Sequence, residues 1–196
     1  MSDTSPEYAL ARAAVALVRQ HQPFALVGGM GVSIRGEVRF TRDVDLAIAV
    51  STDDETERLV RRLGAIGYTA IATVEHETRQ RLATVRLRSP SGIVLDLLAA
   101  SSGIEAEVVA RAEPVTIEGA GTVPVARAEE LLALKVLSMG DARPQDRMDA
   151  TSLLAVNPTL DLAVVRALLT EIHGRGFDRG QDLHAKLDAL LAPRGA

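Results

Sequence analysis

The chain has 196 residues and a formal net charge of −4, from 22 basic and 26 acidic side chains. Apolar residues make up 47% of the chain, enough for a packed core, whereas aromatic residues make up 3% and cysteine is absent. This composition excludes disulfides, thiolate zinc sites and a cysteine nucleophile, and it disfavours proteins that hold duplex DNA by bulk positive charge or single strands by base stacking.

The first part of the chain mixes helix and strand patterns. Ser5 followed by Pro6 marks the start of a helix, because serine is a good N-cap and proline suits the first helical position. A short apolar run at 24–27 leads into Gly28-Gly29 and a further short helix. Residues 43–50 alternate in the manner of a strand. Further helices are expected at 53–66 and 104–112, and further strands at 68–74, 81–88, 92–99, 115–117 and 123–125.

From residue 127 onward the pattern is almost wholly helical. Glycine and proline turn signals separate the expected helices, at 127–139, 145–156, 161–173 and 180–191. We therefore predict an α/β (α+β) fold, with a mixed sheet and flanking helices over residues 1–125 and a C-terminal helical bundle over residues 126–196.

Gly28 and Gly29 come directly after a strand. Without a Cβ, they allow a ligand close to the backbone, and the N–H groups of a helix that begins there suit a phosphate. An ordinary turn would also explain the pair.

Asp43 and Asp45 belong to the strand at 43–50. Successive side chains of a strand alternate between its faces, so the two carboxylates point to the same side while Val44 points into the core. Two adjacent negative charges repel unless a cation lies between them, and Mg²⁺ prefers carboxylate oxygens. The alternative is that Asp43 ends a loop and Asp45 is solvated.

Asp96 is a single acidic residue within an otherwise apolar strand at 93–98. Aspartate is rarely buried unless it is paired or bound to a metal. A metal shared with Asp43 and Asp45 would explain its position. The alternative is a buried aspartate that is hydrogen-bonded or paired with an arginine.

Lys135 and the arginines are the candidate binding cations. Lys135 lies in a helix that is apolar nearly all round, so it either reaches along the surface to solvent or faces a cleft that holds negative charge. If it is an unpaired, half-buried charge, its removal leaves the nucleotide-free protein as stable or more stable. Asp146 and Asp149 share one helix face, and an acidic residue in the first turn of a helix is ordinary. Arginines that could contact phosphates lie at 35, 39, 42, 79, 81, 86 and 88.

Together these motifs resemble the signature of the nucleotidyltransferase superfamily: Gly28-Gly29, thirteen intervening residues, Asp43-x-Asp45, and a later single Asp96 on a strand. Residues 39–46 are similar to the AbiEii-type branch, the toxin half of type IV toxin–antitoxin systems. Lys135 and residues 143–149 resemble the later Lys and Asp motif of that branch. The resemblance covers about residues 24–155.

The resemblance implies a nucleotidyltransferase fold that moves a nucleoside monophosphate from an NTP to an acceptor hydroxyl. It makes Asp43, Asp45 and Asp96 the catalytic and metal-binding residues, with Mg²⁺ or Mn²⁺ as cofactor and Asp96 on the acceptor side, where it helps to take the hydroxyl proton. The remaining implied residues bind the nucleotide: Gly28, Gly29 and Ser33 around the β- and γ-phosphates, Lys135 as a neutralising charge, and Asp146 as its orienting partner.

Three functions are consistent with these expectations. The first is a toxin-like enzyme that modifies an RNA 3′ end, with tRNA as the first candidate and a cognate antitoxin as partner. The second is a nucleotidyltransferase acting on a small hydroxylated molecule such as an antibiotic, and the third is a nucleotide-binding module without catalysis. A signal peptide and an apolar run long enough for a membrane span are both absent from the sequence, which favours the cytoplasm.

Overall fold

The structure is a computed structural model that describes residues 5–76 and 79–192. Its strands are β1 (Phe24–Leu26), β2 (Val44–Ile48), β3 (Thr69–His76), β4 (Arg81–Arg88), β5 (Val94–Leu98), β6 (Glu113–Ile117) and β7 (Gly121–Val125). Its helices are α1 (Pro6–Arg19), α2 (Gly28–Arg35), α3 (Asp53–Gly64), α4 (Glu105–Arg111), α5 (Ala128–Ser138), α6 (Pro144–Val156), α7 (Leu162–Gly174) and α8 (Leu183–Leu191).

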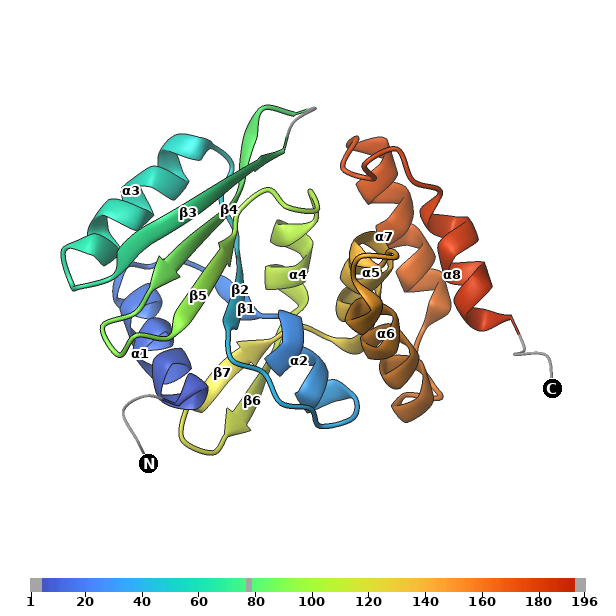
Figure 1. Cartoon of the computed structure of the whole chain (residues 1–196), viewed down its shortest axis with the longest axis horizontal. Coiled ribbons are helices and arrows are strands. Elements are labelled where there is room, and N and C mark those ends of the chain that lie inside the picture. The colour runs from blue at the N-terminus through green and yellow to red at the C-terminus, as the bar shows by residue number, and fades with distance from the viewer. Residues whose placement is uncertain (1–4, 77–78, 193–196) are drawn as a thin grey trace.

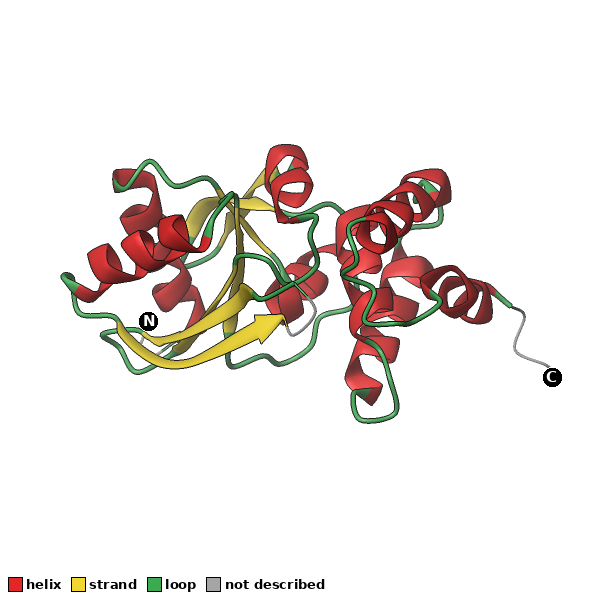
Figure 2. Ribbon diagram, turned by 90° about the horizontal axis from the view of Figure 1, so that it is seen from above, coloured by secondary structure: helices red, strands yellow, loops and turns green. Residues whose placement is uncertain are grey.

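The strands form one mixed seven-stranded sheet in the order β3-β4-β5-β2-β1-β7-β6. The β2–β5 and β1–β7 pairs are parallel, and the other neighbours are antiparallel. Figure 1 shows the sheet between helices on both faces, with the bundle of α5 to α8 beside it. Figure 2 shows the same two parts from above. The expected mixed sheet followed by a helical bundle is confirmed.

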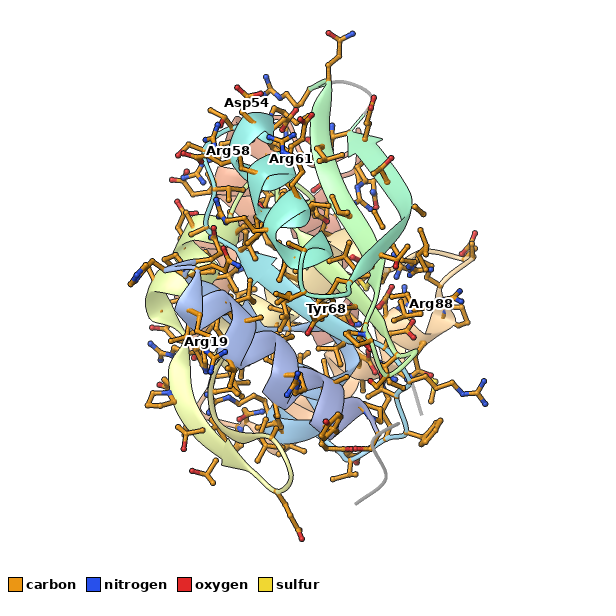
Figure 3. All side chains as sticks on the ribbon, turned by 90° about the vertical axis from the view of Figure 1, so that its left-hand side faces the viewer. Arg19, Asp54, Arg58, Arg61, Tyr68 and Arg88 are labelled. Atoms are coloured by element: carbon orange, nitrogen blue, oxygen red, sulfur yellow. The ribbon has the colours of Figure 1, made fainter. Side chains whose placement is uncertain are left out.

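Two apolar cores hold these layers together. Leu10 of α1 and Leu59 of α3 pack with Leu46 and Ile48 on one face of the sheet, which is the side that Figure 3 presents. Ala47 of β2 lies in the second core, on the opposite face, together with α4 and the buried sides of α5 to α8. The side chains of β2 therefore alternate between the two cores, and a polar residue among them must lie beside one of the two helical layers.

Local sequence signals place the ends of these elements. Ser5 accepts a hydrogen bond from the backbone N–H of Tyr8 at the start of α1, as a serine N-cap does. The last helix starts at Leu183, three residues later than expected, because the side chain of Asp182 caps it there. Among the helices of the described residues, none has the length and apolar character needed to cross a membrane.

The pairing of β1 with β2 sets up the site. The two strands are antiparallel, with Leu26 opposite Leu46, and the backbone N–H of Val27 donates to the carbonyl of Asp45 at 2.9 Å. The end of β1, where α2 begins, therefore lies against the start of β2. Gly28 and Asp45 become neighbours although seventeen positions separate them in the sequence.

Candidate active site

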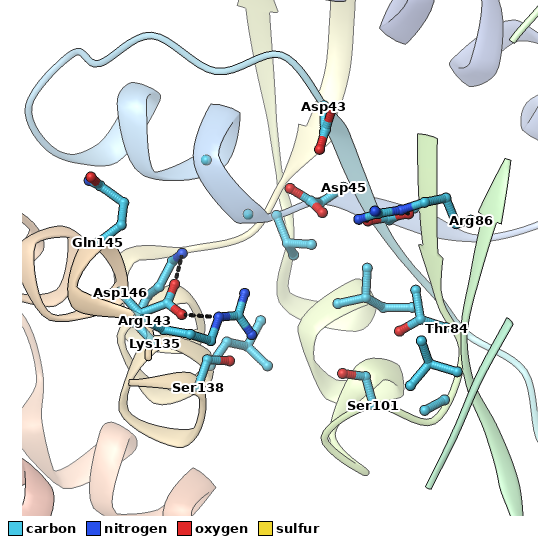
Figure 4. A pocket seen from close by; sticks show the side chains of 18 of the residues that line it. Asp43, Asp45, Thr84, Arg86, Ser101, Lys135, Ser138, Arg143, Gln145 and Asp146 are labelled. Carbon is cyan, nitrogen blue, oxygen red and sulfur yellow. Dashed lines mark hydrogen bonds and ion pairs between the residues drawn. The ribbon is translucent and has the colours of Figure 1, made fainter. Parts of the chain in front are cut away.

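A cavity of about 1090 Å³ lies between the sheet and the helical bundle. The first turn of α2, strands β2 to β5, and helices α5 and α6 contribute its lining. Figure 4 shows Asp43, Asp45 and Arg86 on the sheet side, and Lys135 and Asp146 on the helical side. The cavity brings together all the candidate site residues of the sequence except Ser33, which is not among the described residues that line it.

Position 28 requires a glycine, because the side chain of Asp45 lies against its backbone. It has a φ of +59°, a region that L residues with side chains rarely adopt, and a Cβ at this position would lie 1.9 Å from Oδ2 of Asp45. At Gly29, a Cβ would lie 2.8 Å from the Nη2 atom of Arg39 and 2.8 Å from Oγ1 of Thr41. Both glycines line the cavity, but side chains of the protein itself already approach their backbone closely.

Asp45 and Asp96 are partners in the register of the parallel strands β2 and β5. Both line the cavity together with Asp43, and Asp96 lies on the strand next to β2, as expected. Burial, followed by the negative charge of Asp96, raises the pKa of Asp45 from 3.8 to about 6, while the positive charge of Lys135 acts in the opposite direction. The ionised form of Asp45 is therefore disfavoured in this cavity, mainly by burial.

Asp96 is paired with an arginine, which is the alternative to a metal site that its sequence position left open. Arg86 lies opposite it in the β4–β5 register, and the guanidinium forms a bidentate contact, Nε to Oδ1 at 2.9 Å and Nη2 to Oδ2 at 2.7 Å. Asp96 is 8% exposed. The hydrogen bond to Asp96 raises the pKa of Arg86, and the charges of Asp43 and Asp45 contribute in the same direction. Arg86 is thus a fixed cation within the carboxylate cluster, which the sequence did not identify.

Lys135 faces the cavity and is fully paired. Its Nζ lies 2.7 Å from Oδ1 of Asp146 and 2.7 Å from Oδ2 of Asp149, and its side chain is 12% exposed. Arg39 contacts the same Asp149 with Nε at 2.7 Å and Nη2 at 2.9 Å. These ion pairs join the loop before β2 to α5 and α6. The idea that Lys135 is an unpaired charge is wrong, and Asp149, left without a role by the sequence, holds two of the cations.

Ser33 lies outside the cavity lining, contrary to its expected place beside the nucleotide phosphates. Its Oγ donates to the carbonyls of Gly29 at 3.0 Å and Arg39 at 3.1 Å, and accepts from the N–H of Arg39 at 3.3 Å. Ser33 therefore ties α2 to the loop that carries Arg39. The hydrogen bonds of this side chain therefore support the loop.

The arginines that were expected to contact phosphates lie apart. Arg81 pairs with Asp53 at 2.7 Å, Arg86 pairs with Asp96 in the cavity, and Arg88 is exposed outside it. The guanidinium of Arg79 lies over the ring of Phe177, 5.9 Å from its centre. Arg35 contacts Glu113 at 2.8 Å. The alternation of the strand and the separate partners of these arginines divide the set between different surfaces.

A second group of cations stands at the helical side of the cavity. Arg143 and Arg179 both line it, and Nη2 of Arg179 donates to the carbonyl of Ser101 at 3.3 Å. Desolvation, followed by the positive charge of Arg143, lowers the pKa of Arg179. Arg143 also contacts Asp146, with Nε at 2.9 Å from Oδ2. Two neighbouring guanidiniums in a cavity suit an anionic group, because an anion would relieve their mutual repulsion.

The carboxylates fit a divalent cation only in part. Asp43 and Asp45 offer oxygen donors in the cavity, and burial, followed by the charge of Asp96, raises the pKa of Asp45. Both oxygens of Asp96, by contrast, already accept hydrogen bonds from Arg86. Within residues 5–76 and 79–192, no group of three histidine or acidic side chains is arranged to hold a metal ion. Asp43 and Asp45 are therefore the carboxylates of the cavity that would hold a divalent ion.

Comparison with known proteins places this arrangement among nucleotidyltransferases. The model of the family described as nucleotidyl transferase AbiEii toxin, type IV toxin–antitoxin system, matches residues 9–194. No curated protein matches the chain significantly.

Two solved structures share the fold over nearly their whole length. An antigenic nucleotidyltransferase-like protein from Paracoccidioides brasiliensis has a TM-score of 0.50 and 19% identity, over 96% of this chain and 94% of that one. The antibiotic-resistance factor ANT(2'')-Ia has a TM-score of 0.58 and 16% identity, over 96% of this chain and 97% of that one. At these identities the likeness concerns the fold alone.

Proposed function

Because the chain belongs to the AbiEii nucleotidyltransferase toxin family of type IV toxin–antitoxin systems, we propose that it transfers a nucleoside monophosphate from an NTP to the 3′ hydroxyl of an RNA, with tRNA as the first candidate. In this reaction the acceptor oxygen forms a bond to the α-phosphorus, the bond between the α-phosphorus and the bridging oxygen breaks, and pyrophosphate leaves. The observation that carries the proposal is the cavity itself, which joins Asp43 and Asp45 to Lys135 and to two arginines at its helical side.

Asp43 and Asp45 are proposed to hold Mg²⁺, or Mn²⁺ in its place. A divalent ion at this position supplies charge stabilisation for the phosphate that is transferred. Gly28 and Gly29 line the cavity at the start of α2, and this helix N-terminus is proposed to face the β- and γ-phosphates, with the N–H of Gly29 engaged by Asp45 before a nucleotide binds. These residues position the triphosphate, and positioning with charge stabilisation is the main source of catalysis in phosphoryl transfer.

Lys135 is proposed to neutralise charge on the bound nucleotide. Asp146 and Asp149 fix its Nζ at 2.7 Å from each carboxylate, so the ammonium is oriented before a substrate arrives. A cation that is already positioned does not need to reorganise during the reaction. Asp146 thereby acts through Lys135, and the contact of Arg39 with Asp149 extends this support to the loop before β2.

An anionic acceptor fits the helical side of the cavity better than a cationic one. Arg143 and Arg179 lie there together, and their mutual repulsion favours a phosphate between or beside them. The net charge of −4 does not oppose this, because the contacts are local. An aminoglycoside would bring its positive charges toward these arginines. The acceptor side therefore supports RNA over a small cationic antibiotic, although ANT(2'')-Ia has a similar fold.

The direct test is a survey of acceptors. The chain is incubated with each α-³²P-labelled NTP, with Mg²⁺ or Mn²⁺, and with total RNA or a panel of small hydroxylated compounds including aminoglycosides and lincosamides. We expect label on RNA of tRNA length and none on the small compounds. Label on a small compound alone would replace RNA as the acceptor, and label on neither would remove the proposed reaction.

The toxin–antitoxin family implies an antitoxin protein as partner. We propose that an antitoxin encoded beside this chain restrains the transfer reaction. Co-expression of that neighbouring gene should restore growth to cells in which the chain is induced. If cells that produce the Asp45→Asn variant grow normally without the neighbouring gene, the toxicity depends on the carboxylate cluster.

A further inference from the structure

Arg86, Asp96 and Asp45 lie in one row across three adjacent strands. Arg86 of β4 faces Asp96 of β5 in the antiparallel register, and Asp96 faces Asp45 of β2 in the parallel register. Residues paired in this way point to the same face of a sheet. All three line the cavity. The register therefore places the guanidinium of Arg86 among these carboxylates, so that Arg86 supplies a positive charge that a metal ion would otherwise supply.

The contact between Arg86 and Asp96 is strong in its geometry. Both oxygens of Asp96 accept hydrogen bonds from the Nε/Nη2 edge of the guanidinium, at 2.9 and 2.7 Å, and this bidentate pairing is a strong arrangement for arginine and a carboxylate. The side chain of Asp96 is 11% exposed and that of Arg86 is 47% exposed. Release of Arg86 would leave a largely buried carboxylate without its partner, which is costly.

The charges of the cluster agree with this arrangement. Asp43, Asp45 and Asp96 contribute three negative charges when all are ionised, and Arg86 contributes one positive charge, which leaves the charge that one divalent ion neutralises. Without Arg86, three carboxylates would favour two divalent ions, which are held about 3.5–4 Å apart in two-metal sites. The difference between these states is one arginine.

We propose that Arg86 takes the place of a second metal ion, so that the protein binds a single divalent ion at Asp43 and Asp45 while Asp96 positions Arg86. This inference rests on the proposed function for the first ion, and it departs from the metal-binding role that the family resemblance implied for Asp96. Arg86 is a positioning residue of the carboxylate cluster, and Asp96 is its partner and not a metal ligand. Loss of Arg86 then frees Asp96 for a second ion.

The test counts the ions by electron paramagnetic resonance of Mn²⁺. The full chain is titrated with Mn²⁺ in the presence of a non-hydrolysable α,β-methylene NTP. The wild type is expected to give the spectrum of isolated Mn²⁺, with one ion per chain. Arg86→Gln is expected to give the spin-coupled spectrum of two neighbouring ions, with two per chain. Arg86→Lys keeps the charge, so it should remain at one ion.

Two further variants separate structure from mechanism. Arg88→Gln removes the same charge from an exposed position of the same strand and should leave the wild-type spectrum. The double variant Arg86→Gln/Asp96→Asn removes the ion pair without changing the net charge of the cluster, and it should keep the spectrum of a single Mn²⁺ with an affinity within about threefold of the wild type, whereas the loss of a true ligand would weaken it by roughly tenfold or more. This second measurement keeps the inference testable if Arg86→Gln does not fold.

A coupled spectrum in the wild type would overturn the inference and leave the proposed function standing. A single ion in folded Arg86→Gln would also overturn it. If neither the wild type nor any variant binds Mn²⁺, both the inference and the proposed metal-dependent function fail.

Discussion

The carboxylate of Asp45 occupies the space where a side chain on Gly28 would lie, because a Cβ on Gly28 would be 1.9 Å from Oδ2 of Asp45. This contact joins the first turn of α2, which is proposed to bind phosphate, to the strand that is proposed to bind the metal. The position of Asp45 thus depends on the absence of a Cβ seventeen residues earlier in the sequence.

Gly28→Ala should displace Asp45 as well as strain the backbone. The positive φ alone costs about 1–2 kcal/mol in the free energy of unfolding, and the clash with the carboxylate should add at least roughly 1 kcal/mol. Urea denaturation measures the loss, and Mn²⁺ titration measures the displaced ligand. Gly180→Ala is the matched control, because Gly180 has a φ of +70° and no atom within 4 Å of its Cβ position. Equal losses for the two variants would contradict the contact.

Lys135→Met should destabilise the protein, because it leaves Asp146 and Asp149 without their shared cation. Breaking a buried ion pair costs about 3–5 kcal/mol, and the lower end applies here because Arg39 and Arg143 still contact these carboxylates. The double variant Lys135→Met/Asp146→Asn should recover part of the loss in urea denaturation. A single variant as stable as the wild type would mean that Lys135 is not held by these carboxylates.

The raised pKa of Asp45 predicts a fall in stability as the pH rises. Burial and the charge of Asp96 raise this pKa from 3.8 to about 6, so the folded protein keeps a proton that the unfolded chain has already released in this interval. The contribution of Asp45 to the free energy of unfolding should therefore decrease between about pH 4 and pH 6 in the absence of divalent cations, against the opposite contribution of carboxylates with a lowered pKa such as Asp149. Asp45→Asn should lack this component and be more stable than the wild type at pH 7. Parallel pH profiles for the two proteins would contradict the shift.

Arg179→Glu should impair the use of RNA and leave nucleotide binding unchanged. Loss of a charge-assisted contact to phosphate lowers kcat/KM for RNA by roughly tenfold or more, and it should reduce the slope of log affinity against log salt by about 1. Arg58→Glu is the control, because Arg58 is exposed on α3, on the face of the sheet shown in Figure 3. Equal effects of both changes would indicate a general charge effect and remove the proposed acceptor contact.

Much of this fold could be predicted because its signals are local. Ser5 and Pro6 begin α1, and the alternating residues around Asp43 and Asp45 form a strand with both carboxylates at the cavity. The lone Asp96 in an apolar strand also pointed to a special environment. These inferences need only the period of a helix or strand and the cost of burying a charge.

The partners within the site depend on register and packing, which the sequence does not display. Arg86 meets Asp96 because β4 and β5 pair with these two residues opposite each other, and a shift of one residue would turn Arg86 to the other face. Lys135 meets Asp149 only after α6 packs on α5. For Ser33, the family resemblance implied a ligand contact, whereas in the fold its hydroxyl holds the loop at Arg39.

The most direct measurement is the transfer of α-³²P label to RNA by the wild type and by Asp45→Asn, with the RNA either untreated or oxidised by periodate to destroy its 3′ terminal diol. Thermal unfolding and circular dichroism first establish that the variant is folded. We expect label only on untreated RNA and only with the wild type. Label from folded Asp45→Asn, or equal labelling of oxidised RNA, would contradict nucleotidyl transfer to an RNA 3′ hydroxyl at this carboxylate cluster.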